Sequence, residues 1–198
     1  MSTSEKSYHH GDLRAALIVA AIEILESGEP FSMRAVARRA GVSQTAPYRH
    51  FADRAALENA VAVAGFEDLA DELSAVLVSA PEGAKPSETL SELGIAYVLF
   101  ALRRPAEFRI MFGNECDEAD AERVVASRKL RSVLEGSLAA IFPEAEIADL
   151  SIALWSMAHG LAFLHLDGKL WPEPLDDVRA RVHAATTAVL AMKERPNS

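Results

Sequence analysis

The stretch of residues 31–54 constrains the fold of this chain most, because it predicts two short helices joined by a tight turn and followed by a third helix. Ser32 can cap a helix over residues 33–40, and Gly41 tolerates the left-handed backbone that reverses the chain. Ser43 can cap the next helix, over residues 44–50, and Asp53 can cap the third. This layout, with the motif over about residues 32–51, is typical of a helix-turn-helix DNA reader.

The second helix of this predicted motif carries side chains suited to contact with polar partners. An ordinary surface helix favours Glu, Lys and Ala, whereas this one presents hydrogen-bonding and stacking types. They are Gln44, Thr45, Tyr48, Arg49 and His50. The segment therefore predicts a surface that contacts bases or phosphates.

Charge is segregated along the chain in a way that supports this interpretation. Residues 32–54 hold five arginines and one acidic residue, Asp53, so a phosphate backbone would attract them. Residues 55–198 hold 13 basic and 23 acidic side chains, and the whole chain has a net charge of −9. Only the N-terminal part is suited to DNA, although the chain as a whole is acidic.

The remaining sequence predicts an all-α protein, since no segment shows the alternation and β-branched enrichment of a series of strands. Further helices are expected at about residues 11–27, 53–80, 87–103, 105–112, 117–142, 144–166 and 173–194. With 198 residues, half of them hydrophobic, the chain can form two domains. We expect an N-terminal three-helix bundle with the helix-turn-helix over residues 1–54 and a larger helical domain for effector binding and dimerisation over residues 55–198.

Several motifs resemble the tetracycline-repressor (TetR) family of regulators. In the N-terminal part these are YHHGDLR from Tyr8, ARRAGVS from Ala37 and YRHF from Tyr48. In the C-terminal part, RPAEFRIMF from Arg104 and WSMAHG from Trp155 resemble the effector domain of the subgroup named for its Trp, His and Gly. The resemblance implies a homodimeric, ligand-responsive regulator, with a repressor favoured, that binds a palindromic DNA operator.

Geometry and the family pattern together predict the residues that contact DNA. Gln44, Thr45 and Tyr48 lie on the first exposed turns of the recognition helix, and the resemblance implies that Arg34 and Arg54 contact DNA as well. The predicted set is Arg34, Ser43, Gln44, Thr45, Tyr48, Arg49, His50 and Arg54. The alternative for Tyr48 and His50 is packing on the small core, which is the role expected of Val42 and Phe51.

Two features of the reader leave its geometry open. Pro47 stands inside the predicted recognition helix, where the family more usually has a longer aliphatic residue, and it removes the first intrahelical hydrogen bond. The expectation is a short or slightly distorted helix. Tyr8, His9 and His10 form either an arm that reaches DNA or a disordered tail.

The C-terminal part predicts a pocket for a small apolar or amphipathic effector, because aromatic residues on several helices are accompanied by a few polar groups. The candidate pocket residues are Phe66, Tyr97, Phe100, Phe108, Met111, Phe112, Trp155, His159 and Phe163. Ordinary core packing is the alternative for each of them. Trp155 and His159 are four residues apart and share one helical face.

The last predicted helix repeats apolar residues in steps of three and four, as the seam of a helical bundle does. The seam comprises Leu175, Val178, Val182, Ala185, Val189 and Met192. The helix at residues 144–166 is apolar nearly all round from Leu150 onward, which implies burial on more than one side. We expect both helices to form a two-fold dimer through a four-helix bundle.

An enzyme, a cofactor and a metal centre are not expected. The single cysteine, Cys116, lies in an acidic stretch that would raise its pKa, and the histidines lack the spacing of a metal site. No signal peptide or membrane span is indicated, so a cytoplasmic protein without membrane contact is expected. The alternatives are an activator, a regulator controlled by another protein, and a helical enzyme or carrier of an apolar metabolite.

Overall fold

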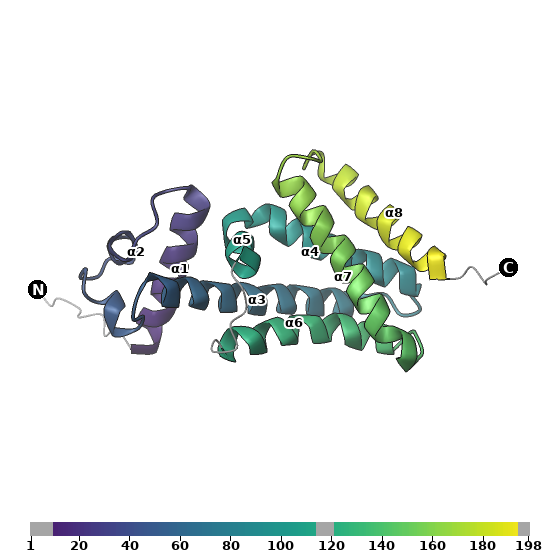
Figure 1. Ribbon diagram of the computed structural model, residues 1–198, viewed down its shortest axis with the longest axis horizontal. Coiled ribbons are helices and arrows are strands. Elements are labelled where there is room, and N and C mark those ends of the chain that lie inside the picture. The colour runs from purple at the N-terminus through teal and green to yellow at the C-terminus, as the bar shows by residue number, and fades with distance from the viewer. Residues whose placement is uncertain (1–9, 114–120, 194–198) are drawn as a thin grey trace, which may run out of the picture. The chain divides into compact units, whose positions relative to one another are not determined.

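A computed structural model describes residues 10–113 and 121–193, and within these residues all regular secondary structure is helical. The α-helices are α1 (His10–Ser27), α2 (Met33–Arg39), α3 (Arg54–Ser79), α4 (Pro86–Arg103), α5 (Pro105–Gly113), α6 (Ala121–Ala139), α7 (Glu144–Leu166) and α8 (Leu175–Lys193), and η1 (Pro47–Arg49) is a 3-10 turn (Figure 1). The all-α prediction is confirmed. Most predicted helix ends lie within a few residues of the observed ones, because capping residues and prolines mark them.

The chain forms two compact units. Unit 1 comprises Met1–Gly65 and Ala106–Arg123, and unit 2 comprises Phe66–Pro105 and Val124–Ser198. These units differ in two respects from the predicted domains, residues 1–54 and 55–198. The first part of α3 belongs with α1 and α2, and so does α5, which is remote from them in sequence.

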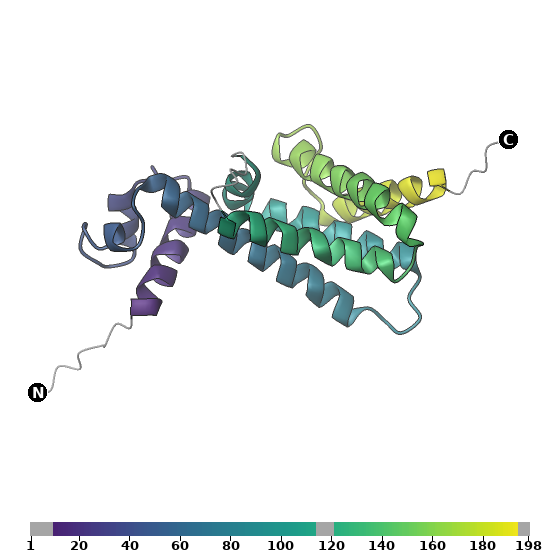
Figure 2. The ribbon, with the colours of Figure 1, turned by 60° about the horizontal axis from the view of Figure 1, so that its bottom comes forward.

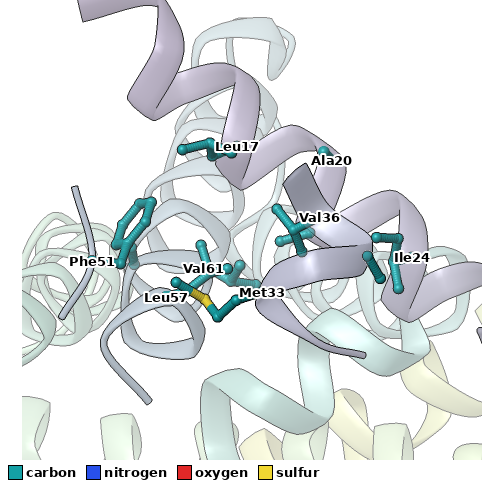
Figure 3. Close-up of a cluster of buried hydrophobic side chains, with 11 residues drawn as sticks. Leu17, Ala20, Ile24, Met33, Val36, Phe51, Leu57 and Val61 are labelled. Carbon is teal, nitrogen blue, oxygen red and sulfur yellow. The ribbon is translucent and has the colours of Figure 1, made fainter. Parts of the chain in front are cut away.

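Unit 1 is built around one apolar cluster shared by α1, α2, α3 and Phe51, which lies between η1 and α3. Figure 3 shows Leu17, Ala20 and Ile24 of α1 beside Met33, Val36, Phe51, Leu57 and Val61. Leu17, Val36, Leu57 and Val61 are completely buried. The apolar stripe of α1 thus covers the helix-turn-helix, as its spacing predicts. Ile110 of α5 packs against the same cluster.

Unit 2 has α4 at its centre. Nine residues of α4 are buried, and this helix packs against both α7 and α8, which form a helical hairpin (Figures 1 and 2). Gly94 permits the approach of α8, since a Cβ at this position would lie 3.0 Å from Val182 Cγ1. Ion pairs join the second half of α3 to the end of α4 and the residue that follows it, through Arg103 with Glu72 and Arg104 with Asp68.

Helix α7 is the one described helix that is long and apolar enough, by length and composition, to cross a membrane. Core helices of soluble proteins also meet that criterion. In α7 the residues facing the interior of unit 2 include Leu150, Leu154, Ala158 and Ala162. Its other side leaves Ile152 and Leu164 well exposed, so the helix has an apolar face that the described part of the chain does not cover.

Candidate nucleic-acid interface and pocket

The turn between α2 and the recognition segment has the local structure that the sequence predicts. Ser32 caps α2, because its Oγ accepts a hydrogen bond from the amide of Ala35 at 3.2 Å. Gly41 has a φ of +70°, in the left-handed region that favours glycine. The amide of Val42 donates to the carbonyl of Ala37 at 3.0 Å and so closes the end of α2. Val42 packs against the core cluster, and Phe51 lies in it, as expected.

The recognition segment itself is shorter than predicted. An α-helix was expected over residues 44–50, but the structure has a turn at residues 44–46 followed by the three-residue 3-10 turn η1. The physical reason is Pro47, which has no amide hydrogen and whose ring would clash with the carbonyl four residues earlier, that of Ser43. That carbonyl instead accepts from the amide of Ala46 at 3.0 Å. The Ser43 hydroxyl faces the hydroxyl of Thr45 at 3.3 Å, rather than capping a helix.

Seven of the eight predicted DNA-contacting residues are exposed on unit 1. They are Arg34, Ser43, Gln44, Thr45, Tyr48, Arg49 and Arg54. Tyr48 is 54% exposed, so its ring does not belong to the core. His50 is only half-buried, and its ring centroid lies 6.5 Å from that of Phe51, which means that part of it packs on the core.

The arginines of the reader differ in how they are engaged. Arg39 forms ion pairs with Glu23 at 3.3 Å and with Glu29 at 2.5 Å. The hydrogen bond with Glu23, and next the charge of Glu29, raise the pKa of Arg39 above its ordinary value. Arg54 pairs with Glu58 at 2.7 Å, and its guanidinium lies over the ring of Phe31. Within the described residues, Arg34, Arg38 and Arg49 form no ion pair. These three cations are therefore available to a phosphate.

Arg14 was not among the predicted contact residues, yet the structure places it at this surface. Its guanidinium lies 5.5 Å from the centroid of the Phe51 ring, directly after the recognition segment, and 4.0 Å from the carboxylate of Glu122. The sequence gives little signal for this position. Arg14 is distant from the motif along the chain and becomes its neighbour only when α1 packs across it.

A second set of contacts that the sequence did not predict fixes α5 within unit 1. The carboxylate of Glu26, near the end of α1, accepts hydrogen bonds from the amides of Glu107 at 2.8 Å and Ala106 at 3.3 Å. These are orphan donors at the N-terminus of α5. At the other end, the buried guanidinium of Arg123 donates to the carbonyls of Ile110 and Met111. Helix α5 is thus capped from α1 at one end and from α6 at the other.

Removal of the Glu26 carboxylate should destabilise unit 1. Glu26→Ala deprives two amides of their acceptor, and loss of such a cap costs about 1–2 kcal/mol. We expect a lower denaturant midpoint with an unchanged slope, measured by circular dichroism. Glu29→Ala is the matched control, because Glu29 is exposed and pairs only with Arg39 and the Ser27 hydroxyl. Equal midpoints for the two variants would show that the cap contributes nothing.

The predicted pocket residues are divided between the units. Phe108, Met111 and Phe112 belong to unit 1, where the rings of Phe108 and Phe112 lie 4.8 Å apart. The other six belong to unit 2: Phe66, Tyr97, Phe100, Trp155, His159 and Phe163. Phe66, Phe100 and Phe108 are fully buried, which is the core role that the sequence left open for them.

Four of the six pocket residues in unit 2 meet at the contact between α4 and α7. The hydroxyl of Tyr97 lies 2.9 Å from His159 Nδ1 and accepts a hydrogen bond from Trp155 Nε1 at 3.3 Å. The ring of Phe163 lies 4.8 Å from that of His159. Trp155 is 37% exposed and lies under the guanidinium of Arg131 at 5.6 Å. We call Tyr97, Trp155, His159 and Phe163 the aromatic cluster.

The surroundings of the aromatic cluster favour neutral groups. The Tyr97 hydroxyl accepts a hydrogen bond from the Trp155 indole and shares another with His159 Nδ1, in which either group can be the donor. Burial lowers the pKa of His159 and raises that of Tyr97, which favours the neutral form of both groups.

Protonation of His159 should be observable through Trp155. Because the folded-state pKa lies below the ordinary value of about 6.5, the unfolded state binds more protons as the pH falls through that value, and the fold loses stability there. In a Trp171→Phe variant, Trp155 is the only remaining tryptophan. We expect its emission to titrate with a midpoint below about 6.5, because a charge gained by His159, whose ring centroid lies 6.1 Å from that of Trp155, changes the surroundings of the indole. Loss of that transition in His159→Gln is the control, and a midpoint above about 6.5 would contradict the assignment.

The predicted seam of α8 needs a correction. Val178 and Val182 are completely buried within a single chain, where α8 packs on α4, so these two side chains cannot contact a second copy. Leu175 and Met192 are 51% and 78% exposed, whereas Ala185 and Val189 are half-buried. A hollow of about 420 Å³ lies between α7 and α8, lined by Glu146, Asp149, Leu150, Ala153, Val189 and Met192.

Some predictions fall outside the part of the chain that the structure describes, among them Cys116, Tyr8 and His9. Within residues 10–113 and 121–193, no three His, Cys, Asp or Glu residues are grouped so that they could hold a metal ion.

Two family models match the sequence. Residues 17–61 match bacterial regulatory proteins of the tetR family, and residues 90–189 match the tetracyclin repressor-like C-terminal domain. A comparison with curated proteins finds no match.

Solved structures resemble most of the chain. A protein of unknown function from Rhodococcus sp. RHA1 is 30% identical, with a TM-score of 0.77 over 92% of this chain and 97% of its own. A TetR transcriptional regulator from the same organism is 21% identical, with a TM-score of 0.68 over 92% of this chain and 98% of its own. The TetR family regulator PfmR from Thermus thermophilus is 21% identical, with a TM-score of 0.61 over 86% of this chain and 96% of its own.

Proposed function

This chain belongs to the TetR family of bacterial regulatory proteins, and we propose on that basis that it is a repressor which leaves its operator when a small molecule binds. Membership makes it a DNA-binding transcriptional regulator with an all-α fold. The observation that carries the proposal is the exposed recognition segment, rich in hydrogen-bonding side chains. It is accompanied by Arg34, Arg38 and Arg49, which form no ion pair within the described residues. A cytoplasmic location, as for other regulators of this family, is part of the proposal.

Contacts to DNA are assigned by chemistry and exposure. Arg34 and Arg49 hold phosphates. Arg54 and His50 supply flanking contacts, for which Arg54 loosens its ion pair with Glu58 and His50 its packing beside Phe51. The exposed side chains of Ser43, Gln44, Thr45 and Tyr48 face base edges or the phosphates beside them. Arg14 adds a further cation at the same surface.

A homodimer is the second part of the proposal. The exposed apolar side chains of the α7 and α8 hairpin, Ile152, Leu164, Leu175 and Met192, support it, because a soluble protein rarely leaves such a face uncovered. Two-fold symmetry would place two readers in successive major grooves, about 34–36 Å apart, and would match a palindromic operator. The seam in this proposal uses the outer faces of α7 and α8 rather than Val178 and Val182.

The ligand response is the third part. The aromatic cluster supports an apolar or amphipathic effector, since its rings offer stacking surface and Trp155 is partly exposed. Binding would favour a conformation with a different reader spacing, a population shift that weakens both operator contacts together. Family membership favours a regulator over an enzyme.

The test combines three measurements on the full chain. Fluorescence anisotropy with DNA that flanks its own gene should show a preference of about a thousandfold or more over unrelated DNA at physiological salt. Sedimentation should give two chains per operator. Compounds that change Trp155 emission should release the DNA; compounds that tighten DNA binding instead would indicate an activator. Tight metabolite binding without any sequence preference would indicate a carrier or enzyme.

A further inference from the structure

Arg14 lies beside the recognition segment, but its acidic partner, Glu122, comes from a distant part of the chain. We propose that the two form an exchangeable pair: a DNA phosphate takes Arg14 from Glu122, so the carboxylate at the beginning of α6 lowers the affinity of the protein for DNA. The inference rests on the proposed DNA contacts and deepens them, because it assigns a residue that opposes binding.

Packing of α1 holds Arg14 in place. Its guanidinium lies 5.5 Å from the centroid of the Phe51 ring, and Phe51 is 4% exposed, so the core fixes the ring. Leu17, one turn further along α1, belongs to the same apolar cluster as Phe51 (Figure 3). Phe51 directly follows His50, the last residue of the recognition segment. The charge of Arg14 is therefore kept at the end of that segment.

The pair of Arg14 with Glu122 is weak enough to exchange. The nitrogen and oxygen lie 4.0 Å apart, and the side chains are 48% and 76% exposed. Exposed pairs of this kind contribute little to stability, whereas a phosphate oxygen at hydrogen-bond distance accepts a strong, charge-assisted bond from a guanidinium. Arg39 differs, because two carboxylates hold it at 3.3 and 2.5 Å.

The first turn of α6 keeps Glu122 near Arg14. The next residue, Arg123, is buried and donates to the carbonyls of Ile110 and Met111, which fixes this turn within unit 1. Removal of the Glu122 charge should therefore leave the turn in place. It should release Arg14 for DNA without a change in the rest of unit 1.

The experiment is a double-mutant cycle with Arg14→Gln, Glu122→Gln and the double variant. Binding is measured by fluorescence anisotropy over a range of salt concentrations, on the DNA that wild type selects from a random pool and on an unrelated duplex. Glu88→Gln is the control for net charge, because Glu88 is also an exposed acid in the first turn of a helix and pairs with a base, Lys85. Thermal melts of all variants should stay close to wild type, since every substituted side chain is largely exposed.

Glu122→Gln should tighten binding by about fivefold at low salt, and Arg14→Gln should weaken it by about tenfold, with smaller effects as salt rises. Both effects should appear on both DNAs, because a phosphate contact carries no sequence information. In the Arg14→Gln background, Glu122→Gln should change the affinity less than twofold, and Glu88→Gln should do the same in wild type.

Two outcomes would overturn the inference while leaving a DNA-binding regulator. Equal tightening by Glu122→Gln with and without Arg14 would show that the carboxylate repels DNA directly, and unchanged binding by Arg14→Gln would show that Arg14 does not contact phosphate. A wild-type protein that prefers no sequence would instead contradict the proposed function, and the exchange would still be measured on the unrelated duplex.

Discussion

Val182→Asp should unfold unit 2. The side chain of Val182 is completely buried in one chain, where it meets α4 at Gly94, and its neighbours Val178 and Thr186 on α8 are equally buried. Loss of its apolar burial together with desolvation of a carboxylate costs about 4 kcal/mol or more. That is a large part of the roughly 5–15 kcal/mol that typically stabilises a domain, so we expect a large fall in melting temperature, measured by circular dichroism.

The matched control is Ala180→Asp, on the same helix and two residues away, where the side chain is exposed. An exposed substitution leaves the packing of α8 on α4 unchanged, so the control should melt close to wild type. If Val182→Asp were instead to melt normally and sediment as a monomer, Val182 would lie at an interface between chains, and the packing of α8 on α4 would be wrong.

Arg34→Ala combined with Arg49→Ala should weaken binding to every DNA sequence. Both side chains are exposed, and neither forms an ion pair with the described residues. A dimer would lose four phosphate contacts, so the slope of log affinity against log salt should fall by about four units. At about 1 kcal/mol per contact, the affinity should fall on the order of a thousandfold.

Arg39→Ala is the control for this pair of substitutions. Arg39 lies on the same helix as Arg34, but Glu23 and Glu29 already neutralise its charge. We expect a loss below tenfold and an unchanged salt slope, measured by anisotropy over a range of salt concentrations. A thousandfold loss in the control, or an unchanged slope in the double variant, would contradict the assignment of the free cations.

The sequence predicted the helices well because their ends depend on local chemistry. Ser32 and Asp53 accept capping hydrogen bonds at 3.2 and 2.8 Å, as their positions before helical stretches predict. The recognition segment was harder to predict, because the effect of a proline on a helix depends on whether the carbonyl four residues earlier finds another hydrogen-bond donor. Pro47 was recognised as a departure, but the tight turns that replace the helix depend on the tertiary packing of Pro47 and Phe51.

Contacts between distant segments could not be predicted from the pattern. The step of three and four on α8 marks an apolar stripe, but the same stripe serves a dimer seam or an internal core, and Val178 and Val182 belong to the core. The capping of α5 by Glu26 joins residues 81 positions apart, and no local motif predicts it. Trp155 and His159 share a helical face as predicted, yet their common partner, Tyr97, comes from another helix.

The most direct test of the account is selection of DNA by the purified full chain from a random pool, followed by sequencing. A DNA-reading dimer predicts an enriched palindrome whose half-site centres lie about 10 base pairs apart or a multiple of that spacing, because the two readers must meet the same groove on one face of the duplex. The Arg34 and Arg49 double variant should enrich nothing under the same salt conditions. A pool that remains random with wild-type protein, at salt low enough for general binding to DNA, would contradict the account.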